Sequence, residues 1–372
     1  SRVLLGFLTQ PQEGKWFLED MGSQIELNLS RAEPTSPVLF TQGSLIVVEG
    51  VLSEGIFHVY QIGAPPPEPR EMTLQHMNVT DPFGNATRSD VIRQQADLEK
   101  ESHDTTFIII SDIHLDQAQV LKNLNKVFSH YEDAGLSMDA QPPVFVLMGS
   151  FVSQTFTRVG GRATHLTAFQ ALADVIASHP FLASRARFIL QPGPEDMGVG
   201  ATLPRRRLPS MLRKALEAKV KHVSFVSNPF RIRFYTQELV FFREDILRKM
   251  QRNCALKTES DQPVDAYMDD GSFVAASSGE DSIFSKLAES ILRQGHLLPL
   301  PLEARPVYWE LDHSLRLDPL PHLLVLADRV DQYYYETEEA EGTKAVNPGS
   351  FSSDGSFMVY YPSSRSVEES RV

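Results

Sequence analysis

The stretch Phe107-Ile108-Ile109-Ile110-Ser111-Asp112-Ile113-His114 joins an unbroken apolar run to a polar turn. Four consecutive apolar, β-favouring residues are typical of a strand that is buried on both faces. Such strands belong to domains in which strands and helices alternate along the chain. Because chemistry in these domains collects where the strands end, the residues that follow each strand are the first candidates for a site.

The same alternation continues from residue 107 towards the last residues of the chain. Helical apolar spacing follows Asp116, covers 166–176 and recurs from Ser282 to Gln294. Further strands are predicted at 144–148, 188–190, 223–226, 232–235, 239–242, 323–326 and 357–361. The pattern predicts an α/β domain over residues 105–372.

Residues 1–63 have a different pattern, with short β-favouring runs separated by turn residues. The runs cover 3–9, 15–18, 25–29, 45–52 and 56–62. Five short strands with small loops predict a compact barrel of the OB-fold type. A Pro-rich and polar linker is expected over 64–104, partly disordered or completing the barrel, with a short helix at 90–100.

Composition limits the functions that are open to this chain. The 35 basic and 48 acidic residues give a formal charge of −13, which argues against a surface that grips nucleic acid throughout. Residues 1–63 carry three basic and seven acidic residues, so the aromatic side chains of the barrel are expected to fill its core or face a protein. The single cysteine, Cys254, excludes an internal disulfide and a zinc site built from cysteines. We expect a reducing compartment and no membrane span.

Asp112 and His114 resemble the first metal motif of the calcineurin-like metallophosphoesterases. In that family the second strand ends in Gly-Asp-x-x-Asp, and here Ser150 and Ser153 stand at the two carboxylate positions. A lone histidine ligand has a counterpart in His296. A pair of metal ions needs a bridging anion and a full ligand set, so the comparison predicts a degenerate site.

The family's other ligand motifs are also changed. The Gly-Asn-His motif falls on Pro192–Asp196, with Pro194, Glu195 and Asp196 at the key positions. The closing Gly-His-x-His falls on 327–330, where Asp328 and Val330 replace the histidines. We therefore expect no catalytic and no metal-binding residue. Two alternatives remain. One is a single weakly held cation on Asp112, Asp196 and Asp328. The other is a purely structural role, in which Asp112 and His114 cap and satisfy the turn after the strand.

A small barrel followed by an inactivated phosphoesterase domain is similar to the B-subunit family of replicative DNA polymerases, and most similar to its epsilon branch. The segments that carry the resemblance are 4–10, 192–196, 242–245, 295–301, 306–309 and 347–351. The epsilon branch also carries a helical N-terminal domain, so we expect this sequence, which starts at Ser1, to be a fragment.

The resemblance implies a nuclear, non-catalytic scaffold. Its partners would be the catalytic subunit of DNA polymerase epsilon, the replicative helicase complex and the other small epsilon subunits, with DNA contact weak or indirect. Zinc would lie in the partner subunit, and this chain would hold no cofactor. The rival interpretations are an active metal-dependent phosphoesterase or nuclease and a single-strand-binding module.

Four further features carry separate expectations. The basic run Arg205, Arg206 and Arg207 is a possible phosphate contact, or a solvated loop. The acidic stretch 258–270 is expected to be a mobile insertion. At least one ring of Tyr333–Tyr335 should be exposed in a strand, and Trp309 is expected in the core.

Overall fold

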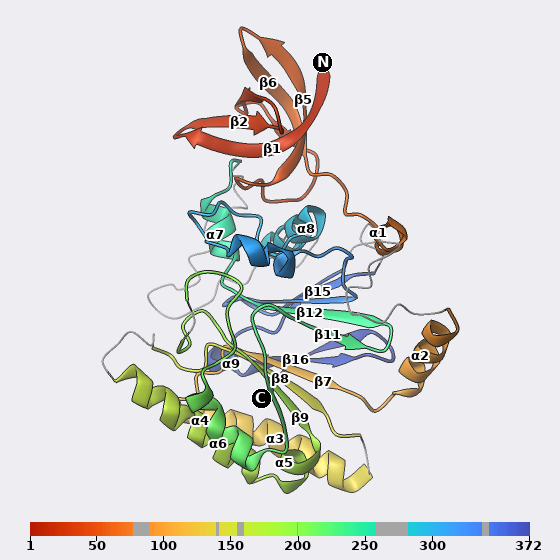
Figure 1. Cartoon of the computed structure of the whole chain (residues 1–372), viewed down its shortest axis with the longest axis vertical. Coiled ribbons are helices and arrows are strands. Elements are labelled where there is room, and N and C mark those ends of the chain that lie inside the picture. The colour runs from red at the N-terminus through yellow and green to blue at the C-terminus, as the bar shows by residue number, and fades with distance from the viewer. Residues whose placement is uncertain (77–88, 139–140, 155–159, 199, 257–281, 337–341) are drawn as a thin grey trace. The chain divides into compact units, whose positions relative to one another are not determined.

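The computed structural model describes residues 1–76, 89–138, 141–154, 160–198, 200–256, 282–336 and 342–372 (Figure 1). Contacts divide the chain into two compact units. Unit 1 comprises Ser1–Asn78, Ile246–Leu320 and Tyr335–Thr343, and unit 2 comprises Val79–Asp245, Pro321–Tyr334 and Lys344–Val372. The acidic stretch 258–270 lies outside the described residues. None of the described helices is long and apolar enough to cross a membrane.

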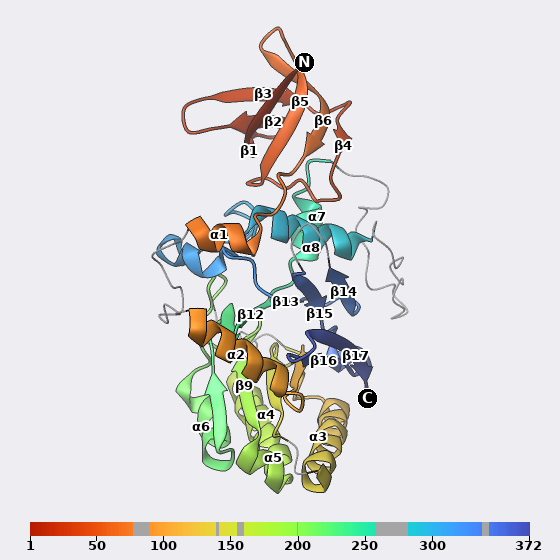
Figure 2. The ribbon, with the colours of Figure 1, turned by 90° about the vertical axis from the view of Figure 1, so that its right-hand side faces the viewer.

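The predicted barrel is confirmed in unit 1 (Figure 2). Its sheet has the order β3-β2-β1-β5-β6-β4, and parallel pairing of β3 with β6 closes it. Gly50 lies at a bulge in β5, where a Cβ atom would stand 2.1 Å from the carbonyl oxygen of His58. The strands are β1 (Arg2–Gln12), β2 (Lys15–Glu19), β3 (Gln24–Asn28), β4 (Glu33–Pro34), β5 (Leu45–Ser53) and β6 (Ile56–Gly63).

The aromatic side chains of the barrel have two environments. Phe40 and Phe57 are buried and pack with the aliphatic side chains of the barrel core. Phe7 and Tyr60 are about half exposed, at 51% and 47%. The barrel therefore uses some rings for its core and presents others to solvent.

Unit 1 joins the barrel to a segment that is distant in sequence. This segment contains α7 (Leu247–Arg252), α8 (Ile283–Gln294) and the 3-10 helix η2 (Trp309–Leu315). The side chain of Gln294 bonds both the N–H and the C=O of Leu45, at 2.7 and 2.9 Å, and Ser290 Oγ accepts from the N–H of Leu39 at 2.8 Å. The sequence predicts domain boundaries at residues 63 and 104, at the two ends of the linker. The contacts of the structure group residues 246–320 with the barrel.

The predicted linker contains two helices, α1 (Arg70–His76) and α2 (Ser89–Glu101). The second confirms the short helix expected at 90–100. Glu99 on α2 is buried and accepts hydrogen bonds from Thr236, and it pairs with Arg365 at 3.1 Å. These bonds fix α2 within unit 2.

Unit 2 contains two mixed sheets, except that the last two residues of β14, Tyr335 and Glu336, are grouped with unit 1. One has the order β10-β9-β8-β7-β16-β17, with β7 to β10 parallel and the β16–β17 hairpin antiparallel at its edge. The other has the order β11-β12-β13-β15-β14. The strands are β7 (Phe107–Ser111), β8 (Val144–Met148), β9 (Arg187–Gln191), β10 (His222–Phe225), β11 (Phe230–Phe234), β12 (Gln237–Arg243), β13 (Leu323–Ala327), β14 (Tyr333–Glu336), β15 (Lys344–Asn347), β16 (Ser356–Tyr361) and β17 (Ser366–Arg371).

The two faces of the β7 sheet are buried in different cores, as the apolar run at 107–110 predicts. Ile108 and Ile110 face a core shared with the helices, while Phe107 and Ile109 face a core between the two sheets. Helices cover one face of the β7 sheet (Figure 1). They are α3 (Ala118–Met138), α4 (Gly161–Ala177), α5 (Pro180–Arg185) and α6 (Ser210–Lys219), while α9 (Phe351–Asp354) precedes β16.

The expectation for Trp309 is wrong. Its side chain is 76% exposed and that of Tyr308 is 47% exposed, because the short η2 helix buries Leu315 and turns its first residues to solvent. In β14, Tyr333 is buried and Tyr334 is 43% exposed, which confirms the expected exposure of one ring.

Candidate functional site

Asp112 lies in the turn at the carboxyl end of β7. Its φ of 56° places it in the left-handed region, which is uncommon for a residue other than glycine. Two backbone bonds hold it there, from its own N–H to the carbonyl of Met148 at 3.1 Å and from the N–H of Ser352 to its carbonyl at 3.2 Å. The turn therefore fixes the Asp112 carboxylate, which is only 2% exposed, inside unit 2.

The Asp112 carboxylate is surrounded by hydrogen-bond donors and positive charge. Its Oδ1 atom is 3.1 Å from His114 Nε2, 3.1 Å from Arg329 Nε and 3.3 Å from Arg243 Nη2. Its Oδ2 atom accepts from the hydroxyl groups of Ser350, at 2.6 Å, and Ser352, at 3.2 Å. Both oxygens are thus saturated by side chains of unit 2.

This environment keeps Asp112 ionised. Burial alone would raise the pKa of the carboxyl, but the close approach of His114, at 3.1 Å, and the charges of Arg243 and Arg329 outweigh it. The pKa of Asp112 therefore lies well below its usual value.

Arg243, the last residue of β12, is fully buried. Its Nε donates to the carbonyl of Gly149 at 2.6 Å, and its Nη1 donates to Asp245 Oδ1 at 2.5 Å and to the carbonyl of Ala327 at 3.3 Å. Burial would lower the pKa of the guanidinium, but the carboxylates of Asp245 and Asp112 raise it. The guanidinium joins the ends of β8, β12 and β13 to the Asp112 turn.

Arg329 follows β13 and supplies the second guanidinium group. Its Nη1 lies 3.6 Å from Glu195 Oε1, in addition to the contact of its Nε with Asp112. The side chain is 28% exposed, whereas that of Arg243 is 0% exposed. Arg329 is thus the outer member of the pair.

The residues predicted after β8 and β9 form a second cluster nearby. The Asp196 carboxylate is buried and accepts from the N–H groups of Phe151 and Gly193, at 2.7 Å each, and burial raises its pKa. Ser150 Oγ accepts from the N–H of Glu195 at 3.4 Å. Asp196 therefore acts as a cap for two loops.

Two more predicted residues, Ser153 and Pro194, lie in the turns that follow β8 and β9. The hydroxyl and N–H of Ser153 bond the carboxylate of Asp116, at 2.5 and 2.9 Å. Pro194 is half-buried in the loop that follows β9. Both residues lie in turns at the carboxyl edge of the sheet.

The last three predicted positions are divided between the units. In unit 2, Asp328 Oδ1 accepts from the N–H of Arg329 at 2.7 Å, and the carbonyl of Val330 accepts from Asn347 Nδ2 at 3.2 Å. His296 belongs to unit 1, where its Nε2 lies 3.3 Å from Asp312 Oδ1.

The donor set around Asp112 does not fit a pair of metal ions. Metal ions at Asp112 would have to approach a carboxylate that two guanidinium groups, an imidazole and two hydroxyls already contact. Within the described part of the chain, no group of three or more His, Cys, Asp or Glu residues is arranged to hold a metal ion. The arrangement can neutralise Asp112 and tie strand ends together, because buried charges need partners of opposite sign.

The basic run divides into one buried and two exposed residues. Arg205 is 1% exposed, forms an ion pair with Glu244 and donates to the carbonyl of Arg243 at 3.1 Å. It is therefore unavailable for a phosphate contact, because the structure uses its charge internally. Arg206 and Arg207 are exposed.

The sequence interpretation missed the partners of Asp112. Arg243 and Arg329 each stand at or just after the end of a buried strand, which is the position where functional side chains were sought. Ser350 follows the Asn347-Pro348-Gly349 turn. A search for all charged side chains at strand ends, rather than for metal ligands alone, could have found both arginines.

Comparison of the sequence with known proteins shows which family the chain belongs to. A profile of the B subunits of DNA polymerases alpha and epsilon matches residues 107–336, more than half of the chain, and a profile of the OB-fold domain of DNA polymerase epsilon subunit 2-like proteins matches residues 1–66. The chain belongs to the DNA polymerase alpha/epsilon B-subunit family. The barrel of unit 1 is accordingly an OB-fold domain.

Relatives that match along the whole chain support the same assignment. The chain is 38% identical to the B subunit of DNA polymerase epsilon from Arabidopsis thaliana over 99% of its own length and 66% of the relative's. It is 37% and 36% identical to DNA polymerase epsilon subunit 2 of Bos taurus and of Homo sapiens, over 100% of its own length and 65% of theirs. The chain thus spans just under two thirds of the length of these curated relatives.

Proposed function

We propose that this chain is a non-catalytic accessory subunit of DNA polymerase epsilon. It binds the C-terminal region of the catalytic subunit, which carries the zinc, and helps to tether the polymerase to the replicative helicase in the nucleus, together with the other small subunits. Membership of the B-subunit family and similarity to relatives named as epsilon subunits support this proposal. Unit 2 then serves as a rigid body with an inactivated calcineurin-like phosphoesterase frame.

The observation that carries the non-catalytic role is the saturation of Asp112. A two-metal hydrolase holds its cations about 3.5–4 Å apart on shared carboxylates. Here Arg243 and Arg329 bring two positive charges to the one aspartate that resembles such a ligand. Guanidinium groups do not activate water or exchange with metal ions, so they supply structure without hydrolytic chemistry.

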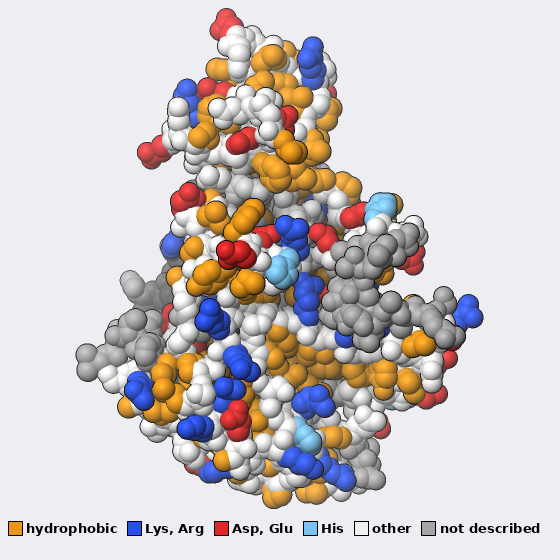
Figure 3. Space-filling model, viewed as in Figure 1, with side chains coloured by type: hydrophobic (Ala, Val, Ile, Leu, Met, Phe, Trp, Pro, Cys, Tyr) orange, Lys and Arg blue, Asp and Glu red, His pale blue; other side chains and the backbone are white. Residues whose placement is uncertain are grey.

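A role in protein binding is supported by exposed apolar side chains in unit 1. On β1, Val3, Leu5 and Phe7 alternate outward with exposures of 65%, 58% and 51%. Figure 3 shows apolar side chains gathered on the visible face of the barrel. Trp309 adds a second exposed site. Large exposed apolar groups of this kind mark protein interaction sites, and Trp is enriched among residues that dominate binding energy.

The test is co-purification of the chain with the C-terminal region of the catalytic subunit. We expect a stable complex that survives gel filtration. Substitution of Leu5→Asp together with Phe7→Asp should weaken it at least tenfold, because both side chains are exposed and neither supports the barrel core. Glu54→Lys, in the β5–β6 turn, is a control on the same barrel.

Failure of the wild-type chain to bind that region would overturn the proposal. Manganese-dependent phosphodiester hydrolysis that is abolished by Asp112→Ala would establish the enzyme instead. Affinity for oligonucleotides that falls steeply with salt would establish a single-strand-binding module.

A further inference from the structure

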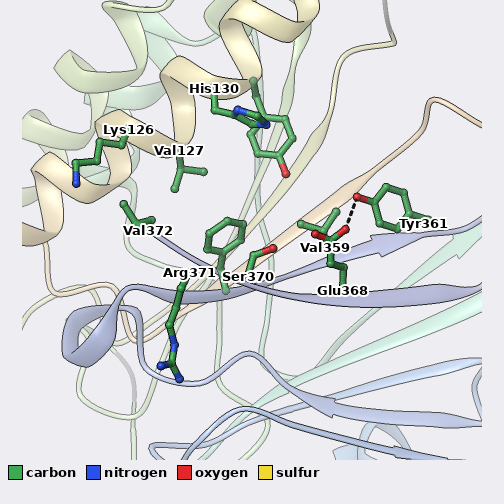
Figure 4. Close-up of a pocket in the computed structure, with 11 residues that line it drawn as sticks. Lys126, Val127, His130, Val359, Tyr361, Glu368, Ser370, Arg371 and Val372 are labelled. Carbon is green, nitrogen blue, oxygen red and sulfur yellow. Dashed lines mark hydrogen bonds between the residues drawn. The ribbon is translucent and has the colours of Figure 1, made fainter.

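One edge of the β7 sheet ends at β17. Among the described strands, β17 pairs with β16 alone, in register from Ser356↔Arg371 to Tyr361↔Ser366. Helix α3 lies over the face of this hairpin, as Figure 4 shows. The strand therefore combines an open backbone edge with a neighbouring helix.

The open edge exposes a defined set of backbone groups. The N–H of Val372 donates to the carbonyl of Gly355, at 3.2 Å, on the β16 side. Hydrogen-bonding direction alternates along an antiparallel strand, so the N–H and C=O groups of Val367, Glu369 and Arg371 point to the open side. Three residues in this orientation can pair with an added strand.

A cavity of about 390 Å³ lies between α3 and the hairpin. Its apolar lining comes from Val127 on α3, from Phe357 and Val359 on β16 and from Val372, together with the rings of Tyr131 and Tyr361. In Figure 4, Val127 points from the helix towards the hairpin, and Val359 rises from the sheet below it. The volume lies within the range of about 300–1,000 Å³ that is typical of small binding pockets.

One basic side chain, that of Lys126, is exposed at the rim of the cavity. The side chain of Arg371 points away from the cavity in Figure 4 and pairs with Asp354 at 2.9 Å. Lys126 has no ion-pair partner among the described residues. The single carboxylate of the lining, Glu368, accepts a hydrogen bond from Tyr361 at 3.0 Å. An acidic group beside Lys126 would therefore complement the rim.

We propose that the β17 edge and this cavity bind an extended segment of a partner protein. The segment adds to the sheet as a further strand, places one bulky apolar side chain between Val127 and Val359, and sets an acidic residue against Lys126. This inference stands on unit 2 alone and does not depend on the proposed role in the polymerase.

The geometry favours an extended segment over a helix. A helix satisfies its own backbone groups and would leave the outward N–H and C=O groups of β17 unpaired. A second copy of this chain is also disfavoured. Edge-to-edge pairing of two β17 strands would bring Glu368, Glu369 and Arg371 of each copy together on the strands, and charged edges oppose such pairing.

The experiment selects peptides from a phage-displayed library of random twelve-residue linear sequences on the whole chain. We expect enriched peptides to share one bulky apolar residue with an Asp or Glu within two positions of it. A synthetic peptide of the enriched sequence is then titrated by fluorescence anisotropy against the variants. Two methylated peptides are compared, one with N-methyl groups on the residues whose N–H groups pair with β17 and one with N-methyl groups on the intervening residues. The first should lose binding, and the second should bind like the unmodified peptide.

Matched variants separate the three contacts. Glu369→Pro removes an outward N–H donor and should weaken binding at least tenfold, while Glu369→Ala retains the donor and should bind like the wild type. Val127→Arg should block the cavity, and Lys126→Glu should reverse the preference for acidic peptides. Arg162→Glu, an exposed charge reversal on α4, is the control for charge. Thermal melting confirms that each variant is folded.

Several results would overturn the proposal. They are the absence of a shared apolar-acidic motif, equal binding by Glu369→Pro and Glu369→Ala, or insensitivity to N-methylation. Concentration-dependent dimers that Glu369→Pro dissociates would show that a second copy occupies the edge instead.

Discussion

Replacement of Arg243 by methionine tests the central claim about the Asp112 site. Methionine keeps an unbranched, apolar side chain in the same space but removes the guanidinium group. The change deprives two carbonyls, those of Gly149 and Ala327, and two carboxylates, those of Asp112 and Asp245, of a donor. All of these contacts lie within unit 2.

The expected loss follows from the burial of these partners. Removal of one member of a buried ion pair costs about 3–5 kcal/mol. Asp245 is 29% exposed and can regain water, and Asp112 retains Arg329, so the individual contacts do not add to a larger total. With about 2–4 °C per kcal/mol for a unit of this size, the melting temperature should fall by roughly 6–20 °C.

The assay is urea and thermal unfolding followed by circular dichroism, with Arg329→Met as the matched control. The outer arginine is partly exposed, so its replacement should cost about 1–2 kcal/mol, because partly hydrated pairs contribute less than buried ones. Equal stability of Arg243→Met and the wild type would refute the reasoning. A larger loss of unfolding free energy for Arg329→Met than for Arg243→Met would also refute it.

Three further predictions concern the same region. The folded-state pKa of Asp112 lies below its usual value of about 3.9, so its ionised form stabilises the fold above that pH and this contribution is lost as the pH falls. The difference in unfolding free energy between the wild type and Asp112→Asn should therefore be large at pH 7 and shrink below about pH 4. A difference that stays constant with pH would contradict this. Gly149→Ala should lower the free energy of unfolding, measured by chemical denaturation, by about 1–3 kcal/mol, because the new Cβ would stand 2.0 Å from Asp196 Oδ2 and 2.5 Å from Gly193 N. The control Gly22→Ala, whose new Cβ would have its nearest contact at 3.9 Å, should change this free energy little. Treatment with EDTA should leave the melting temperature within about 1 °C, since guanidinium groups rather than cations hold Asp112; a fall that added Mn²⁺ reverses would exclude that interpretation.

The predicted strands were confirmed where local pattern and burial coincide. Residues 107–110 are buried on both faces, as four consecutive apolar side chains require of a central strand. The helix predicted from Ser282 is confirmed as well, and Ser282 accepts from the N–H of Phe284 as its cap. Shorter elements such as α5 and β15 were missed, because four to six residues give too little periodicity to read.

The sequence by itself determined the barrel strands, the buried strands of unit 2 and the position of Asp112 after the first of them. These features depend on side-chain spacing and on neighbours along the chain, which local chemistry encodes. Only the tertiary structure decided that Arg205 is buried while Arg206 is exposed, and that Arg243 and Arg329 meet Asp112. Arg243 and Arg329 are separated from Asp112 by 131 and 217 positions in the sequence. Spacing along the chain carries no information about which of such distant charges share one buried site.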